Sequence, residues 1–159
     1  MTCENNTRDL AEDPSATPDV LINLSQHPNW GVRWRVAQNP NTPPEILIQL
    51  STDEEFIVRK HVAMNPNTPP HILGGMLHDF PGIRSGLARN PAIHPSILKH
   101  LLKEEYVEVL QAVACHPSTP HDAITTLSQD KDRVVRLYVA RNPSSPYGIW
   151  IPKYGRVLP

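Results

Sequence analysis

The sequence is poor in the features that would commit it to several common protein classes. It has two cysteines, Cys3 and Cys115, which are too few for a disulfide framework. No hydrophobic run approaches the roughly 18 residues of a membrane-spanning helix, and Met1 to Asp13 lack the apolar core of a signal peptide. The net charge is −1, so no bulk field draws the chain to nucleic acid or to a membrane. We therefore expect a cytoplasmic protein without a membrane partner.

Glycine usage is ordinary, at seven residues, whereas proline is abundant, at 18. The prolines reveal an internal repeat, because the segment Asn-Pro-Asn-Thr-Pro-Pro at 39–44 recurs at 65–70. Weaker copies begin at Asp13, Asn90, His116 and Asn142. The spacings are 26, 26, 25, 26 and 26 residues, and such a regular period is typical of a repeat protein.

Aligned on this period, the repeats show columns of hydrophobic residues at helical spacing. The columns of the second unit are Ile46, Leu47, Leu50, Val58, Val62 and Ala63. Intervals of one, three and four residues indicate helices and not strands. Each unit is therefore predicted to hold two short helices, A and B, over about 43–51 and 56–64 in this unit. One such pair cannot bury its apolar stripe alone, so stacked neighbours must supply the core.

Threonine and asparagine are expected to set the helix ends. Thr42, Thr68 and Thr119 precede proline, and a threonine N-cap followed by proline is a favourable helix start. Helix B ends at an Asn-Pro pair, in which asparagine would adopt the left-handed conformation and proline would stop the helix.

These patterns predict an all-α solenoid of about five two-helix repeats, forming one domain over residues 1–159. Residues 6–12 match the end of a helix B and form a partial first repeat. Residues 13–141 form the five repeats. Residues 142–159, which contain Gly148, Pro152 and Gly155, are expected to be an irregular tail.

The motif at 58–69, Val-Arg-Lys-His-Val-Ala-Met-Asn-Pro-Asn-Thr-Pro, resembles that of the leucine-rich repeat variant family. The resemblance covers about residues 6–146 and implies a right-handed superhelix in which one helix of each pair can be 3₁₀. The pattern is also similar to HEAT repeats, which are relatives in architecture. Some members of the family are linked to an amino-terminal cysteine cluster that holds iron–sulfur. This chain has only Cys3 there, and such a cluster needs about four thiolates, so no cofactor is expected.

Catalytic and metal-binding motifs are missing. The eight histidines form no His-x-x-x-His pair on a helix and fall in different repeat columns, so no metal site is predicted. There is no Gly-rich phosphate loop, no Ser-x-x-Lys and no Gly-x-Ser-x-Gly. We expect a protein that is not an enzyme. An enzyme of the HEAT-like DNA glycosylase type would need a carboxylate beside aromatics, and Glu108 is the sole acid placed on the helix-B face.

Two charged columns predict a structural ladder. An arginine follows the first hydrophobic column of helix B in every unit but the fourth, where Leu110 interrupts: Arg33, Arg59, Arg84 and Arg136. The end of helix A carries the second column: His27, Asp53, Asp79, Glu104 and Asp130. Ion pairs between the two columns would mainly fix the register of the units.

The remaining charge points to a binding surface. Helices B hold ten Lys or Arg and two acids, whereas the rest of the chain holds five and fourteen. The helix-B face away from the core is predicted to be concave, with small residues (Ser85, Gly86 and Ala112) between larger ends. The predicted binding residues on this face are Trp34, Arg35, Lys60, His61, Arg89, Gln111, Tyr138 and Arg141, with Leu137 beside them.

These features favour a non-catalytic scaffold that binds a protein partner, such as an acidic peptide, on the concave face, because solenoids offer extended concave surfaces. The alternative is a nucleic-acid-binding solenoid related to HEAT-like DNA-repair proteins. The isoelectric point of about 6.7 argues against it, since dedicated nucleic-acid-binding domains usually exceed about 9. A solvated polar face without a particular ligand is the third interpretation.

Overall fold

The computed structural model describes residues 3–145, which form eleven α-helices, two short 3₁₀ helices and the turns between them. This range contains no strand. The prediction of an all-α solenoid of two-helix repeats is confirmed. Most of the predicted tail, residues 146–159, lies outside the described residues.

Five pairs of helices follow the single helix α1 (Cys3–Glu12), which stands where the partial first repeat was expected. The A helices are α2 (Pro18–Leu24), α4 (Pro44–Leu50), α6 (Pro70–Gly75), α8 (Pro95–His100) and α10 (His121–Ser128). The B helices are α3 (Trp30–Gln38), α5 (Phe56–Met64), α7 (Pro81–Leu87), α9 (Val107–Cys115) and α11 (Arg133–Arg141).

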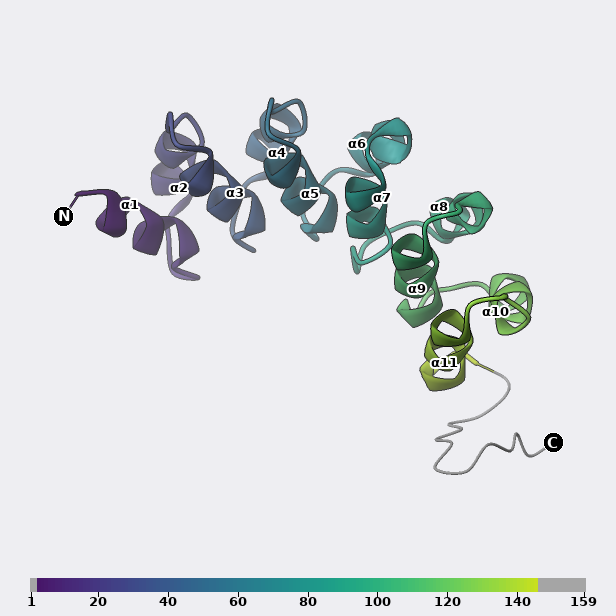
Figure 1. The fold of residues 1–159 in the computed structure, drawn as a ribbon. Helices are drawn as coiled ribbons and strands as arrows, with labels where there is room; N and C mark the ends of the chain where they lie inside the picture. Colours follow the sequence, from purple (N-terminus) through teal and green to yellow (C-terminus); the bar gives the residue numbers. More distant parts are fainter. Residues whose placement is uncertain (1–2, 146–159) are drawn as a thin grey trace.

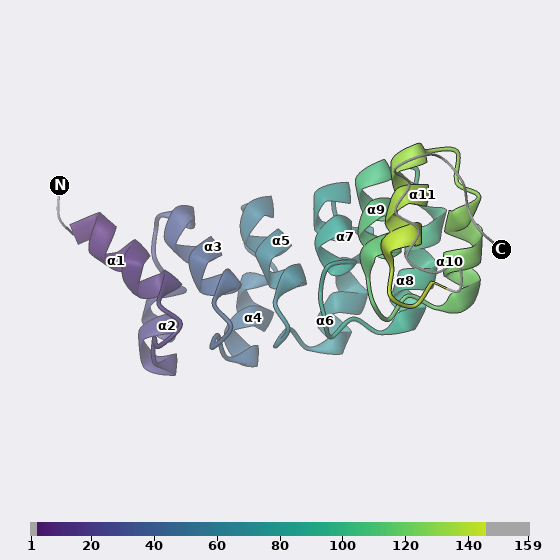
Figure 2. The ribbon, with the colours of Figure 1, turned by 90° about the horizontal axis from the view of Figure 1, so that it is seen from below.

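The units stack into a curved row whose inner side is lined by the B helices (Figures 1 and 2). The A helices form the outer side, and α1 extends the inner row at the N-terminal end (Figure 1). Successive B helices pack closely against one another, as α3 does with α5 and α5 with α7, whereas no A helix has comparable contact with the next A helix. Because the inner layer is packed more closely than the outer one, the row curves and the helix-B face is concave, as predicted.

The core consists of the predicted aliphatic columns. Leu47, Leu73 and Leu98 of the A helices are at most 1% exposed, and the matching valines and alanines of the B helices are equally buried. Leu10, which falls in the valine column, is instead 40% exposed on α1, which packs mainly against α2 and α3. The hydrophobic columns are therefore buried by packing between stacked units, as expected for a solenoid.

The predicted role of the threonines is wrong. Thr42, Thr68 and Thr119 are buried, and each donates its hydroxyl to a backbone carbonyl six residues earlier, at the end of the preceding B helix. The Thr68 Oγ1 lies 2.5 Å from the Val62 carbonyl oxygen. The N-cap of the A helix is the following proline, as Pro43 is for α4. Threonine thus closes one helix, and proline, which has no N–H of its own to satisfy, starts the next.

The predicted left-handed asparagines are also absent from the described repeats. Asn39, Asn65 and Asn142 are extended, with φ near −63°, −73° and −69°. Each is buried, and its side-chain amide donates to two carbonyls of the preceding unit. The asparagine is therefore held by contacts with its neighbour and needs no special backbone conformation.

The helices themselves are mostly α. Only the third and fourth A helices end in 3₁₀ turns, η1 (Met76–His78) and η2 (Leu101–Lys103). The 3₁₀ character implied by the family resemblance is thus limited to these two turns within residues 3–145. None of the helices described is both long and apolar enough to cross a membrane.

Candidate binding surface

The B helices, which line the inner side of the arch, and the turn after α7 carry the eight predicted binding residues. Seven of them lie within α3, α5, α9 and α11, and Arg89 lies two residues beyond the end of α7. We use the name inner face for the surface formed by these eight residues and by the residues at the same repeat positions in the other units. The curvature of the row brings the residues of the first units toward those of the last, on the hollow side of the arch (Figure 1).

An aromatic cluster occupies the N-terminal part of the inner face. The Trp34 and His61 rings, from neighbouring helices, have centroids 4.8 Å apart, and the Arg35 guanidinium lies 4.4 Å from the Trp34 ring centroid. Trp34 is only partly exposed and packs against the core. Burial lowers the pKa of His61, whose Nδ1 donates to the Ile57 carbonyl 2.8 Å away. His61 is therefore a neutral packing partner of Trp34 at pH 7.

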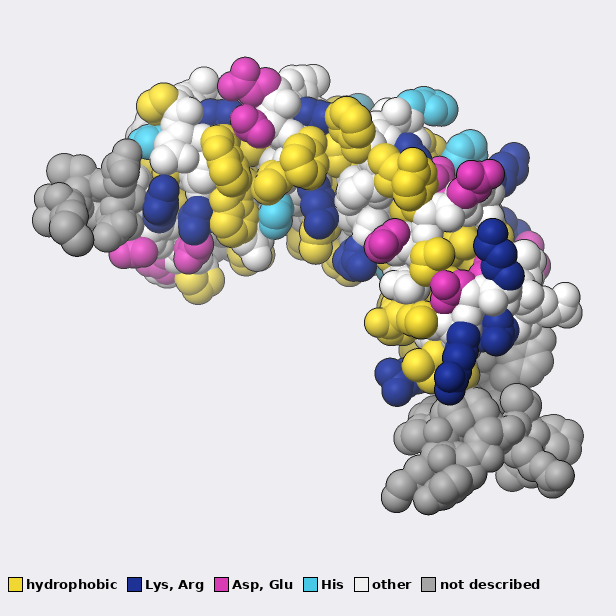
Figure 3. Space-filling model, in the orientation of Figure 1, with side chains coloured by type: hydrophobic (Ala, Val, Ile, Leu, Met, Phe, Trp, Pro, Cys, Tyr) yellow, Lys and Arg dark blue, Asp and Glu magenta, His cyan; other side chains and the backbone are white. Residues whose placement is uncertain are grey.

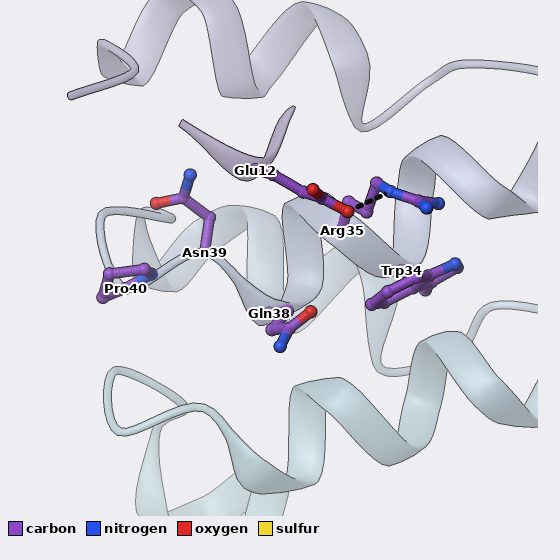
Figure 4. A pocket seen from close by; sticks show the side chains of 6 residues that line it. All are labelled: Glu12, Trp34, Arg35, Gln38, Asn39 and Pro40. Atoms are coloured by element: carbon purple, nitrogen blue, oxygen red, sulfur yellow. Dashed lines mark hydrogen bonds and ion pairs between the residues drawn. The ribbon is translucent and has the colours of Figure 1, made fainter. Parts of the chain in front are cut away.

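Arg35 is engaged within the protein. Its guanidinium pairs with the Glu12 carboxylate of α1 (Figure 4). It also donates to the Gly31 carbonyl. A cavity of about 470 Å³ opens beside this pair, lined by Glu12, Trp34, Arg35, Gln38, Asn39 and Pro40. Arg35 thus shapes this end of the inner face, while Glu12 compensates its charge.

Three other cations of the inner face have no carboxylate partner among the described residues. Lys60 makes no ion pair there, and Arg89 and Arg141 are exposed. Arg89 donates to the Ser85 carbonyl at 3.2 Å, a bond that leaves its charge uncompensated. Burial raises the pKa of the Cys115 thiol, and the charges of Arg89 and Arg141 act on it in the opposite direction. Cys115 therefore lies within electrostatic reach of both arginines.

Sequence reasoning missed part of this surface. Gln38, Met64 and Cys115 occupy the same repeat position as Arg89 and Arg141, and Gln38 and Cys115 are exposed. The signal was available, because these five residues are separated by the repeat spacings of 26, 25, 26 and 26 residues. The column was missed because its members differ in residue type. Only the repeat period shows that they occupy the same position.

The prediction that small residues line an open groove between larger ends is wrong. Ser85 and Ala112 are 5% and 4% exposed, and Gly86 is buried. A Cβ atom on Gly86 would lie 3.0 Å from the Lys60 carbonyl oxygen of α5. These positions are small because adjacent B helices approach closely there. Gln111 and Tyr138 are partly exposed, and Tyr138 packs against the core as Trp34 does.

The arginine ladder is confirmed, and it runs between units. Arg33 and Arg59 each hold a carboxylate of the following unit with two hydrogen bonds, Arg33 to Asp53 at 2.6 and 3.0 Å and Arg59 to Asp79 at 2.8 and 3.0 Å. Arg84 pairs with Glu104 at 2.8 Å. The hydrogen bond from Arg59 holds the pKa of the Asp79 carboxyl below its usual value.

The ladder also holds each unit together internally. Arg59 Nη1 donates to the Asp53 carbonyl of its own unit at 2.7 Å. Arg136 donates only to backbone carbonyls among the described groups, at 2.6 and 3.0 Å. The ladder arginines are thus structural, as predicted, and three of the four are neutralised.

The described residues contain no group of three His, Cys, Asp or Glu side chains that could hold a metal ion.

Comparison with models of known protein families and with curated proteins found no match. Among solved structures, the chain is similar to "a leucine-rich repeat variant with a novel repetitive protein structural motif", with a TM-score of 0.63 and 24% identity. The match covers 89% of this chain and 57% of that one, so the present chain spans little more than half of its length. An engineered protein matches at a TM-score of 0.47 and 18% identity, over 87% of each chain. The first match shows that the fold is that of a leucine-rich repeat variant.

Proposed function

We propose that this protein is a non-catalytic scaffold that binds an acidic segment of a partner protein on its inner face. The observation that carries the proposal is a set of three cations, Lys60, Arg89 and Arg141, that have no carboxylate partner in the described part of the chain and belong to the layer of B helices. Arg33, Arg59 and Arg84 of the ladder cannot serve this role, because carboxylates neutralise them. Charge on a concave face favours a ligand of opposite charge and speeds its approach.

The residues proposed to bind the partner differ in how much of their side chain a ligand can reach. Trp34 and Tyr138 offer only part of their rings, since both pack against the core. Aromatic and arginine side chains are the residues on which binding energy concentrates at protein interfaces. We therefore assign the main electrostatic contribution to Arg89 and Arg141, at the C-terminal half of the arch, and the apolar contact to the exposed edges of Trp34 and Tyr138. A cytoplasmic location agrees with Cys115 being a free thiol.

The test uses a fluorescein-labelled peptide of ten glutamates and measures its binding by fluorescence anisotropy. The variant Lys60→Glu/Arg89→Glu/Arg141→Glu should bind at least about tenfold more weakly than wild type, as truncating interface charges commonly costs more than about 1.4 kcal/mol. The matched control is Lys99→Glu/Lys103→Glu/Lys131→Glu, which makes the same change in net charge at exposed sites away from the inner face. Equal losses in the two triple variants would contradict the proposal, because only the net charge would then matter.

The salt dependence of DNA binding distinguishes the nucleic-acid alternative from the proposed function. Double-stranded DNA that uses three phosphate contacts should lose affinity with a log–log slope of roughly −3 in salt concentration. If DNA binds more tightly than the acidic peptide at 0.15 M salt (about the physiological value) and shows such a slope, the nucleic-acid function replaces the one proposed.

A further inference from the structure

The aromatic side chains of this protein are distributed unusually. Among the described residues, the buried hydrophobic core contains no aromatic side chain. Residues 3–145 include six aromatic residues, and four of them are among the exposed large hydrophobics: Trp30 at 42%, Phe56 at 48%, Phe80 at 63% and Tyr106 at 53%. A single exposed hydrophobic side chain is ordinary, but a contiguous set commonly marks an interaction site.

These four residues occupy nearly equivalent positions in four successive units. Trp30 and Phe56 are the first residues of α3 and α5, and Phe80 and Tyr106 are the N-cap residues of α7 and α9. Each unit thus places one exposed ring where the A helix turns into the B helix. In the view of Figure 3, hydrophobic side chains follow the arch with acidic side chains among them.

Acidic residues accompany the rings in the central units. Asp53, Asp79 and Glu104 are used by the arginine ladder. At the same turns, Glu54 is 85% exposed and lies 3.7 Å from the already paired Arg33. Glu55 and Glu105 make no ion pair among the described residues, and Lys103 is an exposed cation two residues from Glu105. The turn before α5 therefore carries an excess of negative charge, because Asp53, Glu54 and Glu55 face one cation that pairs with them among the described residues, Arg33.

The rings are placed to receive cations. The Arg59 guanidinium lies 6.0 Å from the Phe80 ring centroid, and that of Arg84 lies 6.0 Å from the Tyr106 ring centroid. Both arginines are held from inside by the ladder, and more than half of each ring's residue surface remains open to solvent. An aromatic face attracts a Lys or Arg side chain, and a nearby carboxylate strengthens that preference.

We propose that this aromatic edge, formed by Trp30, Phe56, Phe80 and Tyr106 with Glu54, Glu55 and Glu105, binds an extended basic segment of a partner protein. The segment carries Lys or Arg at every third residue. Packed helical layers repeat at roughly 8–10 Å, and a polyproline II chain advances about 3.1 Å per residue, or about 9 Å in three residues. One cation per three residues therefore matches one ring per unit.

This surface is distinct from the inner face, and the inference does not depend on the function proposed for that face. The edge is acidic and aromatic, whereas the inner face carries the unpaired cations. The two surfaces would let one scaffold hold two segments of opposite charge. Each can fail without the other, because the residues tested do not overlap.

The experiment uses the full chain and two labelled peptides of identical composition. One has four Pro-Pro-Arg triplets, and the other has four consecutive arginines flanked by four prolines on each side. Anisotropy at 0.15 M salt should show that the triplet peptide binds more tightly than the clustered one. The variant Phe56→Ser/Phe80→Ser/Tyr106→Ser should bind the triplet peptide at least roughly tenfold more weakly, since three exposed cation–π contacts are lost. The matched control is Ile22→Ser/Ile48→Ser, two residues of the outer helices that are 40% and 41% exposed, and it should bind as wild type does.

Three results would overturn the proposal. The first is unchanged binding by the triple variant, shown by circular dichroism to be folded. The second is equal or tighter binding of the clustered peptide, which would indicate charge attraction without the predicted spacing. The third is a dimer of the wild-type chain in sedimentation that the triple variant abolishes, which would mean that a second copy covers the edge.

Discussion

The side-chain amide of Asn90 donates a hydrogen bond to the backbone carbonyl of Asn65, 2.7 Å away, and so joins residues at the same position of neighbouring units. The same amide reaches the Ala63 carbonyl at 2.8 Å, and its oxygen accepts from the Ala92 N–H. Asn39, Asn65 and Asn142 repeat this arrangement, and His116 takes the position once. These buried side chains therefore form a continuous ladder from α1 to the last unit. The ladder lies at the C-terminal ends of the B helices, whereas the arginine ladder lies near their N-terminal ends.

Removing one member of this ladder should be costly. Asn65→Ala leaves the buried Ala37 carbonyl and the Asn67 N–H without their partner and removes one of two hydrogen bonds to the Asn39 carbonyl. A buried polar group left unsatisfied costs about 1–3 kcal/mol, so we expect the free energy of unfolding to fall by at least about 2 kcal/mol in urea denaturation. The exposed-site control Gln49→Ala should change it by less than about 0.5 kcal/mol. Similar values for both variants would show that the ladder adds little to stability.

His116 gives the ladder a dependence on pH. Its Nε2 donates to the Asn90 carbonyl at 3.0 Å, and its Nδ1 accepts from the Ser118 N–H, so the ring is neutral. Burial lowers the pKa of His116 below its usual 6.5. As pH falls below 6.5, the unfolded chain binds the proton first, and the free energy of unfolding decreases until the folded-state pKa is passed.

The measurement for His116 is urea denaturation as a function of pH. His116→Asn restores the residue of the other units and should remove part of the decrease below pH 6.5. His61, whose pKa is also lowered by burial, accounts for a share that remains. A variant whose stability falls with pH as steeply as that of wild type would exclude His116 as the titrating group.

Two glycines of α7 should respond oppositely to alanine. A Cβ on Gly86 would meet the Lys60 carbonyl at 3.0 Å, so Gly86→Ala forces α5 and α7 apart and should cost about 1–3 kcal/mol. Gly82 has nothing within 4 Å of the same atom, and Gly82→Ala should be neutral or stabilise by up to about 1 kcal/mol, because alanine favours the helix. Thermal unfolding of the pair tests this close approach; equal shifts in melting temperature would argue against it.

The register of the helices is tested by another pair. Leu98 is fully buried in α8, and Leu98→Ala should lower the free energy of unfolding by about 2–5 kcal/mol. Lys103 is exposed on η2, and Lys103→Ala should lower it by less than about 0.5 kcal/mol. Denaturant midpoints that move equally would contradict the assignment of buried columns.

Much of the fold could be predicted because hydrophobic periodicity is a local signal repeated five times. Helix α5 begins at Phe56 and ends at Met64, as the spacing of Val58 and Val62 indicated. The roles of Thr68 and Asn65 could not be obtained in this way, because both residues are common at helix ends for reasons confined to one helix. Their actual partners lie in the preceding helix or unit, and only the stacked structure brings them together.

The candidate surface could be predicted less completely. Helical spacing placed Trp34 and Arg35 on the inner face, but it could not show that Glu12 of α1 compensates Arg35. Likewise, a small residue at Gly86 is compatible with an open groove or with close packing, and the choice depends on the distance between α5 and α7. The sequence shows an aromatic residue near the start of helix B in each of the first four units, at positions 30, 56, 80 and 106. It could not show that these rings are exposed, because exposure depends on how the units stack.

The most direct measurement of the central claim follows a thiol on the inner face. In the variant Cys3→Ser, Cys115 is the single cysteine of the chain, and it is exposed between the fields of Arg89 and Arg141. Its rate of alkylation by iodoacetamide is measured with and without a saturating amount of the ten-glutamate peptide. An acidic segment bound on the inner face should slow alkylation several-fold, and Lys60→Glu/Arg89→Glu/Arg141→Glu should abolish the protection. An unchanged rate while the peptide is bound would mean that the acidic ligand occupies another surface and would contradict the proposed function.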